Sequence, residues 1–523
     1  MSPPGPRAPM PEAPSTDQPP PSAPSVGLAN ASSRSVSVAW PKPATAHGTR
    51  DAFPHTRRPL PWAIAAFLAM LFLIPIDSTE LKVHLPVDSH IDRFAVVALL
   101  LLWICFGGDQ RAILRTRRSK LYAGAVAVFV VLAIASLLLD SVRIVNVSEV
   151  HLAAKRFALL GGFVAVSWFT LSALRFEDLR GFTSYLIGLA CVMALGMLIE
   201  RHTGTNLFYE WTSALLKPIA TVAPAPTDIH PAYGSDGRVT VVGPTIHGLA
   251  ATTMLMVAMP FALVRIFDAR SLRSRALNIA AFALMLAGAA STDRKTALLV
   301  PVAVVLYFAI YRPRQVLRLA PIGAVLLLLF VHLSSPGAIG SLLSPSSGFE
   351  SSSTAHRIGD FEDVTPDVLA HPLLGRGFGT LDPEQTNVFR INDDEYVDEI
   401  WEVGAIGLAA YLFMILAPVI VARRAIRTRD PAVAPLALAA SAGCVAYFVV
   451  NALFDAMSFP QAPYVFFVVA ALTIIASAGP EGNVMPVREE RLRYAALRGI
   501  RGSARSANEA AIGQGAAITS SRP

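Results

Sequence analysis

The chain has 523 residues, of which 53% are hydrophobic and only 15% are charged. A soluble protein carries about a quarter charged residues, because its surface must contact water. The composition therefore indicates a membrane protein and excludes a soluble enzyme, a nucleic-acid-binding protein and a coiled coil.

Both ends of the chain differ in composition from its middle. Residues 1–58 are rich in proline, serine and alanine and contain no long apolar run. Such a segment buries too little apolar surface to offset the entropy lost on ordering, so we expect a disordered tail. Residues 479–523 form a second tail, which is polar and rich in arginine.

Residues 59–478 alternate apolar runs with short polar connectors. Most runs approach the roughly 20 residues that a helix needs to cross the hydrocarbon of a bilayer. Lipid offers backbone groups no hydrogen-bond partners, so each run is expected to be a continuous helix. We therefore predict an all-α polytopic membrane protein with about twelve transmembrane helices, over residues 59–76, 94–108, 121–139, 157–174, 182–199, 245–264, 276–291, 296–311, 315–333, 403–422, 432–454 and 461–478.

Basic residues gather in every second connector, for example at 111–120, 265–275 and 423–429. The positive-inside rule places these connectors, and with them both termini, in the cytoplasm. Two long connectors, 200–244 and 334–402, then lie outside; the second is the large extracytoplasmic loop between the ninth and tenth helices. Loops of this length are usually functional, so any chemistry is expected on the outer face.

The spans hold almost no charged residues near their centres, which argues against an ion-coupled pump. The outer turn 291–296 nevertheless contains two cations, Arg294 and Lys295. One interpretation is a local Asp293–Lys295 surface pair with side chains that extend to the interface. The other is an anion site, in which the rigid guanidinium of Arg294, together with Arg238, binds a diphosphate.

The long outer loop offers further candidates, each with a structural alternative. Residues 371–379 are rich in glycine, which is typical of a turn that needs positive φ. The acidic residues 393–402 fit a solvated helix start, since carboxylates favour a helix N-terminus. Alternatively, one of these carboxylates is a general base that accepts a proton from an attacking hydroxyl. His371 precedes a proline, as turn residues often do.

Taken in chain order, these segments resemble the O-antigen ligase/polymerase superfamily, whose members share a Wzy-type C-terminal domain. The resemblance covers about residues 237–410. It rests on Arg238 followed by Gly-Pro-Thr-Ile-His-Gly-Leu-Ala at 243–250, Thr-Asp-Arg-Lys-Thr-Ala at 292–297, Arg357, His-Pro-Leu-Leu-Gly-Arg-Gly at 371–377, and Glu395-Tyr396 leading to Glu-Val-Gly-Ala-Ile-Gly-Leu at 402–408.

The resemblance implies a glycosyltransferase that needs neither a metal nor another cofactor. Such an enzyme, in the bacterial cytoplasmic (inner) membrane, transfers a glycan from an undecaprenyl-diphosphate carrier to a hydroxyl of an acceptor glycan or lipid. Its partners would be membrane lipid and other polysaccharide-assembly proteins. A transporter or flippase, and a sensor or scaffold that binds wall polymer through the loop 334–402, are the alternative functions.

The resemblance also implies roles for individual residues. It assigns the donor diphosphate to arginines, and a structural or substrate-positioning role to the residues around the last motif. The diphosphate set is Arg238, Arg294, Arg357 and Arg376; the positioning set is Tyr396, Glu402, Gly404 and Gly407. Ligases of the family carry a His-Asn pair where this chain has Asp393 and Asp394, which favours a polymerase or another glycan transferase. We expect Asp393 or Asp394 to be the catalytic base, with His371 behind it.

Overall fold

The computed structural model describes residues 51–83, 89–106, 116–140, 147–229, 239–333, 364–380, 394–428 and 430–480. Three predicted site residues, Arg238, Arg357 and Asp393, lie outside these ranges. So do most of the two predicted tails and most of the loop 334–402.

Helices account for nearly all the regular structure in the described ranges, and each predicted apolar run lies mainly within one of them. The helices are α1 (Pro59–Leu73), α2 (Ile91–Phe106), α3 (Arg117–Asp140), α4 (Val147–Ala173), α5 (Leu179–Thr203), α6 (Leu207–Leu216), α7 (Pro226–Ile229), α8 (Gly248–Asp268), α9 (Leu272–Ala290), α10 (Thr296–Tyr311), α11 (Pro313–Leu333), α15 (Glu395–Ile426), α16 (Val433–Asn451) and α17 (Gln461–Ala478).

Of the helices described, 7 are long and apolar enough to cross a membrane, namely α3, α4, α5, α8, α15, α16 and α17. Two others, α1 and α10, are equally apolar but shorter. The chain is thus a multi-pass helical membrane protein, which confirms the predicted class.

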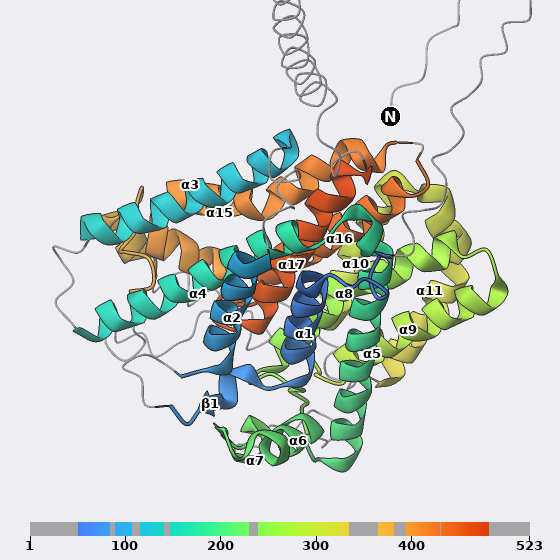
Figure 1. Cartoon of the computed structure of the whole chain (residues 1–523), viewed down its shortest axis with the longest axis horizontal. Coiled ribbons are helices and arrows are strands. Elements are labelled where there is room, and N and C mark those ends of the chain that lie inside the picture. Colours follow the sequence, from blue (N-terminus) through green and yellow to red (C-terminus); the bar gives the residue numbers. More distant parts are fainter. Residues whose placement is uncertain are drawn as a thin grey trace, which may run out of the picture. The chain divides into compact units, whose positions relative to one another are not determined.

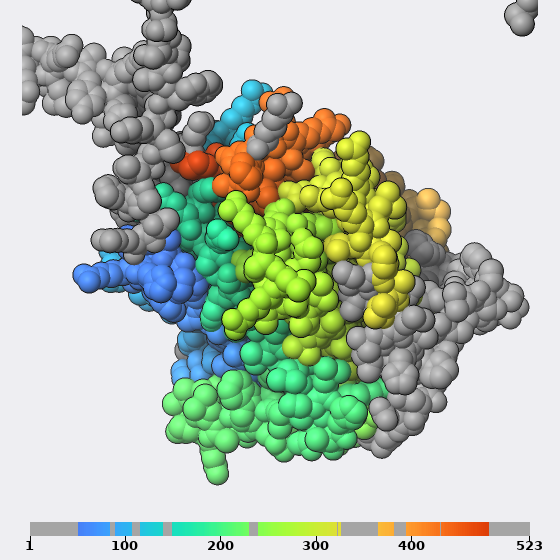
Figure 2. Space-filling view, turned by 90° about the vertical axis from the view of Figure 1, so that its right-hand side faces the viewer, coloured from blue at the N-terminus to red at the C-terminus, as the bar shows by residue number. Residues whose placement is uncertain are grey.

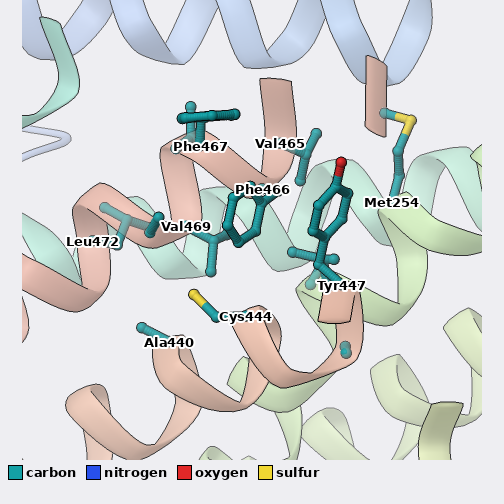
Figure 3. Packing of buried hydrophobic residues seen from close by; sticks show 14 of the residues in the cluster. Met254, Ala440, Cys444, Tyr447, Val465, Phe466, Phe467, Val469 and Leu472 are labelled. Atoms are coloured by element: carbon teal, nitrogen blue, oxygen red, sulfur yellow. The ribbon is translucent and has the colours of Figure 1, made fainter. Parts of the chain in front are cut away.

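The centre of the bundle is formed by α8, α16 and α17 (Figure 1). In both α8 and α17, 94% of the most apolar stretch of 18 residues is buried inside the protein and does not face lipid. Small residues permit this close approach: a Cβ on Gly443 of α16 would lie only 2.8 Å from the Val257 carbonyl oxygen of α8. Larger rings fill the remaining space, and Tyr447 stacks on Phe466 with ring centroids 4.2 Å apart (Figure 3).

Ion pairs and hydrogen bonds between helix ends define two opposite ends of the bundle. At the first, Arg58 Nη2 lies 2.7 Å from Asp178 Oδ1, which joins the starts of α1 and α5. Arg265 at the end of α8 donates to Ser184 Oγ at 2.7 Å, and Arg312 pairs with Asp268 at 2.9 Å. We call this the basic end, because the arginine-rich connectors adjoin it.

The opposite end, here called the loop end, carries the described parts of two connectors, residues 74–83 with 89–90 and residues 204–229 with 239–247. A two-stranded antiparallel ribbon ties them together: β1 (Thr79–Leu81) pairs with β2 (Ala220–Val222). Figure 1 shows β1, α6 and α7 close together at the bottom of the view. The side chain of Gln461 at the start of α17 donates to the Pro244 carbonyl at 2.6 Å, which attaches the connector to the bundle core.

Ordered structure begins before the predicted end of the N-terminal tail at residue 58. The Phe53 ring is 4% exposed and contacts the rings of Trp62, Phe182 and Tyr185. Its backbone N–H donates to Asp178 Oδ1 at 2.9 Å. Phe53 therefore packs the last part of the proline-rich region, from Asp51 onward, against the basic end.

Candidate functional site

The two motifs most characteristic of the resemblance meet in space. The glycine-rich turn, residues 371–379, lies against the first part of α15 through backbone hydrogen bonds in both directions. Gly377 N–H donates to the Glu402 carbonyl at 2.8 Å, and Ala405 N–H donates to the Pro372 carbonyl at 2.9 Å. The turn is therefore built into α15 rather than projecting from it.

Glycine is required on both sides of this contact. Gly404 interrupts α15 with φ +69° and ψ −176°, and a Cβ there would lie 2.3 Å from the carbonyl carbon of Leu373. Gly375 also has φ +69°, and a Cβ there would lie 2.4 Å from the carbonyl of Glu402. Such backbone conformations strongly favour glycine. The predicted positive-φ turn is thus confirmed at Gly375.

Two other residues of the predicted positioning set shape the same region of α15. The Tyr396 hydroxyl donates to the Phe448 carbonyl of α16 at 2.6 Å, which ties the start of α15 to its neighbour. Gly407 is buried, and a Cβ there would lie 2.4 Å from the Val403 side chain one turn earlier. Tyr396 therefore fixes the start of α15 against α16, and Gly407 leaves room for the Val403 side chain beside the break at Gly404.

The acidic start of α15 is mostly buried rather than solvated. Asp394 is its N-cap, and its Oδ1 accepts a hydrogen bond from Tyr396 N–H at 2.9 Å. The following carboxylates have exposed fractions between 1% and 6%, namely Glu395, Asp398, Glu399 and Glu402. The interpretation as a solvated helix start is therefore wrong for these four residues, although Asp394 does cap the helix.

Arg156 of α4 is the cation that faces this acidic cluster. Its Nη1 lies 3.2 Å from Glu402 Oε1, and its Nη2 donates to Ser458 Oγ at 3.1 Å. Other carboxylates, including that of Asp455, also act on it electrostatically. A charge this deep is stable only when it is paired. The carboxylate of Glu402 also accepts from Gly379 N–H at 2.9 Å, so it joins α4, the turn and α15.

Sequence reasoning missed Arg156, although a signal was present. Lys155 and Arg156 precede the fourth apolar run on the side predicted to lie outside, against the positive-inside trend. The same departure from that trend drew attention to Arg294.

Arg376 is held by carboxylates rather than presented alone to an anion. Its Nη2 lies 2.8 Å from Glu149 Oε1 of α4, and its Nη1 lies 3.8 Å from Asp367 Oδ2. His371, five residues earlier, is partly buried, and its carbonyl accepts from Gly375 N–H at 3.0 Å within the turn. Arg376 thus holds the glycine-rich turn against α4, and His371 stabilises the turn from within.

The loop between α16 and α17, residues 452–460, links the acidic cluster to a second group of residues. Met457 N–H donates to Glu395 Oε2 at 2.8 Å on one side. On the other side the mutually stacked rings of Phe454 and Phe459 contact the ring of His247, with centroid distances of 5.5 and 5.4 Å. The α16–α17 loop therefore brings the last motif and the motif at 243–250 into one neighbourhood.

Arg294 lies close enough to His247 to act on it electrostatically, so it belongs to the same neighbourhood. His247 is the N-cap of α8, and its Nδ1 accepts from Leu249 N–H at 3.4 Å. Burial, and next the positive charge of Arg294, lower the pKa of His247 to about 4. Arg294 itself is exposed, in the turn between α9 and α10 at the loop end.

An ion pair to α5 fixes the Arg294 turn. The Asp293 carboxylate lies 3.0 Å from Arg201 Nη2 in the last turn of α5, and both side chains are nearly buried. Asp293 adopts φ +54°, a conformation that aspartate tolerates better than most residues. Arg201, which no motif indicated, therefore anchors the turn to α5.

The segment 239–247 is held to α5 by its backbone. Glu200 accepts from Gly243 N–H at 2.9 Å and from Val242 N–H at 3.3 Å. Asn206 Nδ2 donates to the Gly243 carbonyl at 2.7 Å. These contacts fix the segment that leads into α8 against the end of α5.

A metal ion needs a group of ligand side chains. Within the described ranges no group of three or more His, Cys, Asp or Glu side chains has the arrangement of a metal site. Cys105, Cys191 and Cys444 are free thiols, of which only Cys444 is fully buried.

A comparison with known protein families finds no match to this chain, and neither does a comparison with curated proteins.

Proposed function

We propose that the chain is a metal-independent membrane glycosyltransferase of the O-antigen polymerase or ligase type. It moves a glycan from an undecaprenyl-diphosphate carrier to an acceptor hydroxyl during surface polysaccharide synthesis. One observation carries this proposal: the separated sequence motifs meet at the loop end, where the α16–α17 loop contacts both His247, beside Arg294, and Glu395 at the start of α15.

The proposed chemistry requires fixed positive charge beside the leaving diphosphate. Arg294 is exposed at the loop end, and its neighbour Asp293 is engaged by Arg201. Arg238 and Arg357 complete the proposed diphosphate set. Fixed arginines at a low-dielectric boundary stabilise developing negative charge without a metal ion. The Glu149 pair gives Arg376 a positioning role in this scheme.

The acceptor hydroxyl must lose a proton as it attacks. Asp393 and Asp394, at the N-terminus of α15, are the proposed bases, with His371 in the adjoining turn behind them. One oxygen of Asp394 caps the helix through Tyr396 N–H, which fixes the direction of its carboxylate. A base held in one orientation contributes more to catalysis than a mobile one.

In this proposal the basic end faces the cytoplasm and the loop end faces outward, with about twelve spans and both termini inside. Enzyme function is favoured over transport by the position of the charges. The central parts of the described apolar helices contain no Asp, Glu, Lys or Arg, whereas the buried charges described above lie near helix ends. Transporters coupled to ions place such residues near the bilayer midplane.

Arg294→Ala tests the proposal, with Arg273→Ala as the matched control. Both arginines are exposed, but Arg273 lies at the start of α9 and Arg294 follows its end, on the other side of the bundle. We expect Arg294→Ala to slow glycan transfer on the order of 10²–10³-fold, since one charge-stabilising donor is lost. Arg273→Ala should leave transfer unchanged.

Surface glycan from a deletion strain that carries each variant, separated on a gel, measures the effect. Asp393→Asn should also abolish chain extension. Membrane levels of each variant serve as the control for folding. Polymer of normal length from both Arg294→Ala and Asp393→Asn, at equal protein levels, would rule out the proposed roles.

A further inference from the structure

The helix α6 exposes a stripe of large apolar side chains. Leu207, Trp211 and Leu215 are 39%, 46% and 67% exposed. They recur every four residues, so they lie along one side of the helix. Ile219, in the turn that follows, is 55% exposed.

The other sides of α6 face different surroundings. Phe208, Tyr209 and Thr212 are buried against the protein. The exposed residues Glu210 and Ser213 form a polar side. The helix thus presents one side to the protein, one suited to water and one that is apolar yet uncovered.

One contact joins the apolar stripe to the end of a membrane helix: the indole N–H of Trp211 donates to the carbonyl of Leu73, the last residue of α1, at 3.2 Å. Just beyond α6, Lys82 Nζ donates to the Lys217 carbonyl at 2.6 Å. Tryptophan and lysine are characteristic of the level at which hydrocarbon gives way to lipid headgroups.

The position of α6 in the fold agrees with a location at the level of the lipid headgroups. In Figure 1 it lies across the loop end, at the foot of α5, and in Figure 2 the green atoms of this segment form the lower edge of the described part. The left-handed C-cap Gly204 ends α5 and lets the chain turn away from the direction of that span.

We infer that α6 is an interfacial helix, which inserts Leu207, Trp211, Leu215 and Ile219 into the headgroup–acyl boundary of the leaflet at the loop end. A second copy of the chain fits the stripe less well. Four partly exposed side chains around a helix of 10 residues fall short of the roughly 800 Å² per partner that a stable dimer buries. A lipid surface needs no such area, and amphipathic helices of this kind bind it through their apolar side.

The inference is independent of glycan transfer. Asn206, the N-cap of α6, also holds the Gly243 carbonyl. An α6 fixed in the interface therefore holds the segment 239–247 at a constant depth.

Spin labels at single cysteines test the inference in the full-length chain, in a background with Cys105→Ser, Cys191→Ser and Cys444→Ala. The labelled variants are Leu207→Cys and Leu215→Cys for the stripe, with Glu210→Cys and Ser213→Cys as matched controls one turn away or less. The protein is reconstituted into vesicles of phosphatidylethanolamine and phosphatidylglycerol. Collisions with oxygen, which partitions into lipid, are compared with collisions with a water-soluble nickel chelate.

We expect the oxygen-to-nickel collision ratio to be several-fold higher at positions 207 and 215 than at positions 210 and 213, because only the stripe contacts acyl chains. In the chain with its native cysteines, Trp211→Phe should also remove a component of tryptophan fluorescence that brominated lipid quenches. Equal nickel accessibility at all four positions would overturn the inference. So would spin–spin broadening between copies at 207 and 215, which would identify a second copy as the occupant.

Discussion

At the scale of single residues, two ion pairs at the loop end join distant segments. Arg201 of α5 pairs with Asp293 before α10, and Arg156 of α4 pairs with Glu402 of α15. A buried charge without its partner is costly, so each pair requires its two segments to lie together. Arg201 and Arg156 belong to none of the recognised motifs, yet they position the proposed site.

His247 makes the stability of the loop end depend on pH. Its pKa of about 4 lies below the ordinary value near 6.5, so the unfolded chain binds more protons between these pH values. Stability should therefore fall as the pH decreases through this window, by at most about 3 kcal/mol. Protonation also removes the acceptor that caps Leu249 N–H.

Thermal denaturation of the purified protein at pH 7 and pH 4.5 measures this effect. His247→Gln should weaken the pH dependence, whereas His202→Gln, an exposed histidine at the same end, should not. Arg294→Gln removes the second cause of the lowered pKa and should reduce the acid-induced loss. An identical pH dependence in the parent protein and His247→Gln would contradict the assignment.

The Arg156–Glu402 pair should contribute more to stability than an ion pair that water reaches. Arg156→Gln leaves the buried Glu402 carboxylate uncompensated, which typically costs about 3–5 kcal/mol. Arg312→Gln, which breaks the more exposed pair with Asp268, should cost about 1 kcal/mol or less.

The difference between these two variants is measurable as a difference in thermal midpoint under one set of conditions. The double variant Arg156→Gln with Glu402→Gln should recover part of the loss, because no unpaired charge remains on either side of this pair. Equal destabilisation by Arg156→Gln and Arg312→Gln would show that Arg156 is not the compensating charge of the acidic cluster.

At the scale of elements, α15 and the glycine-rich turn depend on each other. Backbone hydrogen bonds run both ways between them, and each contributes a glycine at the closest approach. This explains why two motifs separated in sequence are both rich in glycine. The break at Gly404 divides the buried acidic start of α15 from its apolar remainder.

Gly404→Ala should destabilise the protein by at least about 2 kcal/mol, since a Cβ strains the backbone and meets the Leu373 carbonyl at 2.3 Å. Gly188→Ala is the matched control, because a Cβ at this helical position of α5 has no heavy atom within 4 Å. Alanine favours a helix by up to about 1 kcal/mol over glycine, so the control should be neutral or stabilising. The midpoints of thermal denaturation decide between these outcomes; tolerance of alanine at 404 would contradict the described contact.

At the scale of the whole molecule, contacts divide the helix ends between a basic end and a loop end. Arg58, Arg265 and Arg312 make their contacts at the first, and the proposed site lies at the second. Alternation of the helices between these ends agrees with the order of connectors inferred from charge. The orientation of the ends in the membrane remains a prediction from the positive-inside rule.

Cysteine accessibility in intact cells tests that orientation. In a background without the three native cysteines, Glu210→Cys at the loop end should react with a membrane-impermeant thiol reagent added outside. Ser274→Cys at the basic end should react only after the membrane is permeabilised; both positions are exposed. The reversed pattern would place the proposed site in the cytoplasm and would exclude transfer on the outer face.

The class of the protein and the approximate positions of its seven long apolar helices follow from the sequence alone. Apolar runs of this length leave a backbone in lipid no alternative to a helix, so composition decides the element. The positive φ of Gly375 illustrates how local such rules are. Arg294 also stands out locally, as a cation in a connector that the positive-inside rule predicts to lie outside.

Only the tertiary structure decided which charges meet. Asp293 pairs with Arg201 of α5, and Glu402 pairs with Arg156 of α4. Pairing of buried charges depends on which helices pack together and at what depth, and no local pattern encodes these two quantities. For the same reason, acidic residues whose sequence pattern fits a solvated helix start are buried at the start of α15.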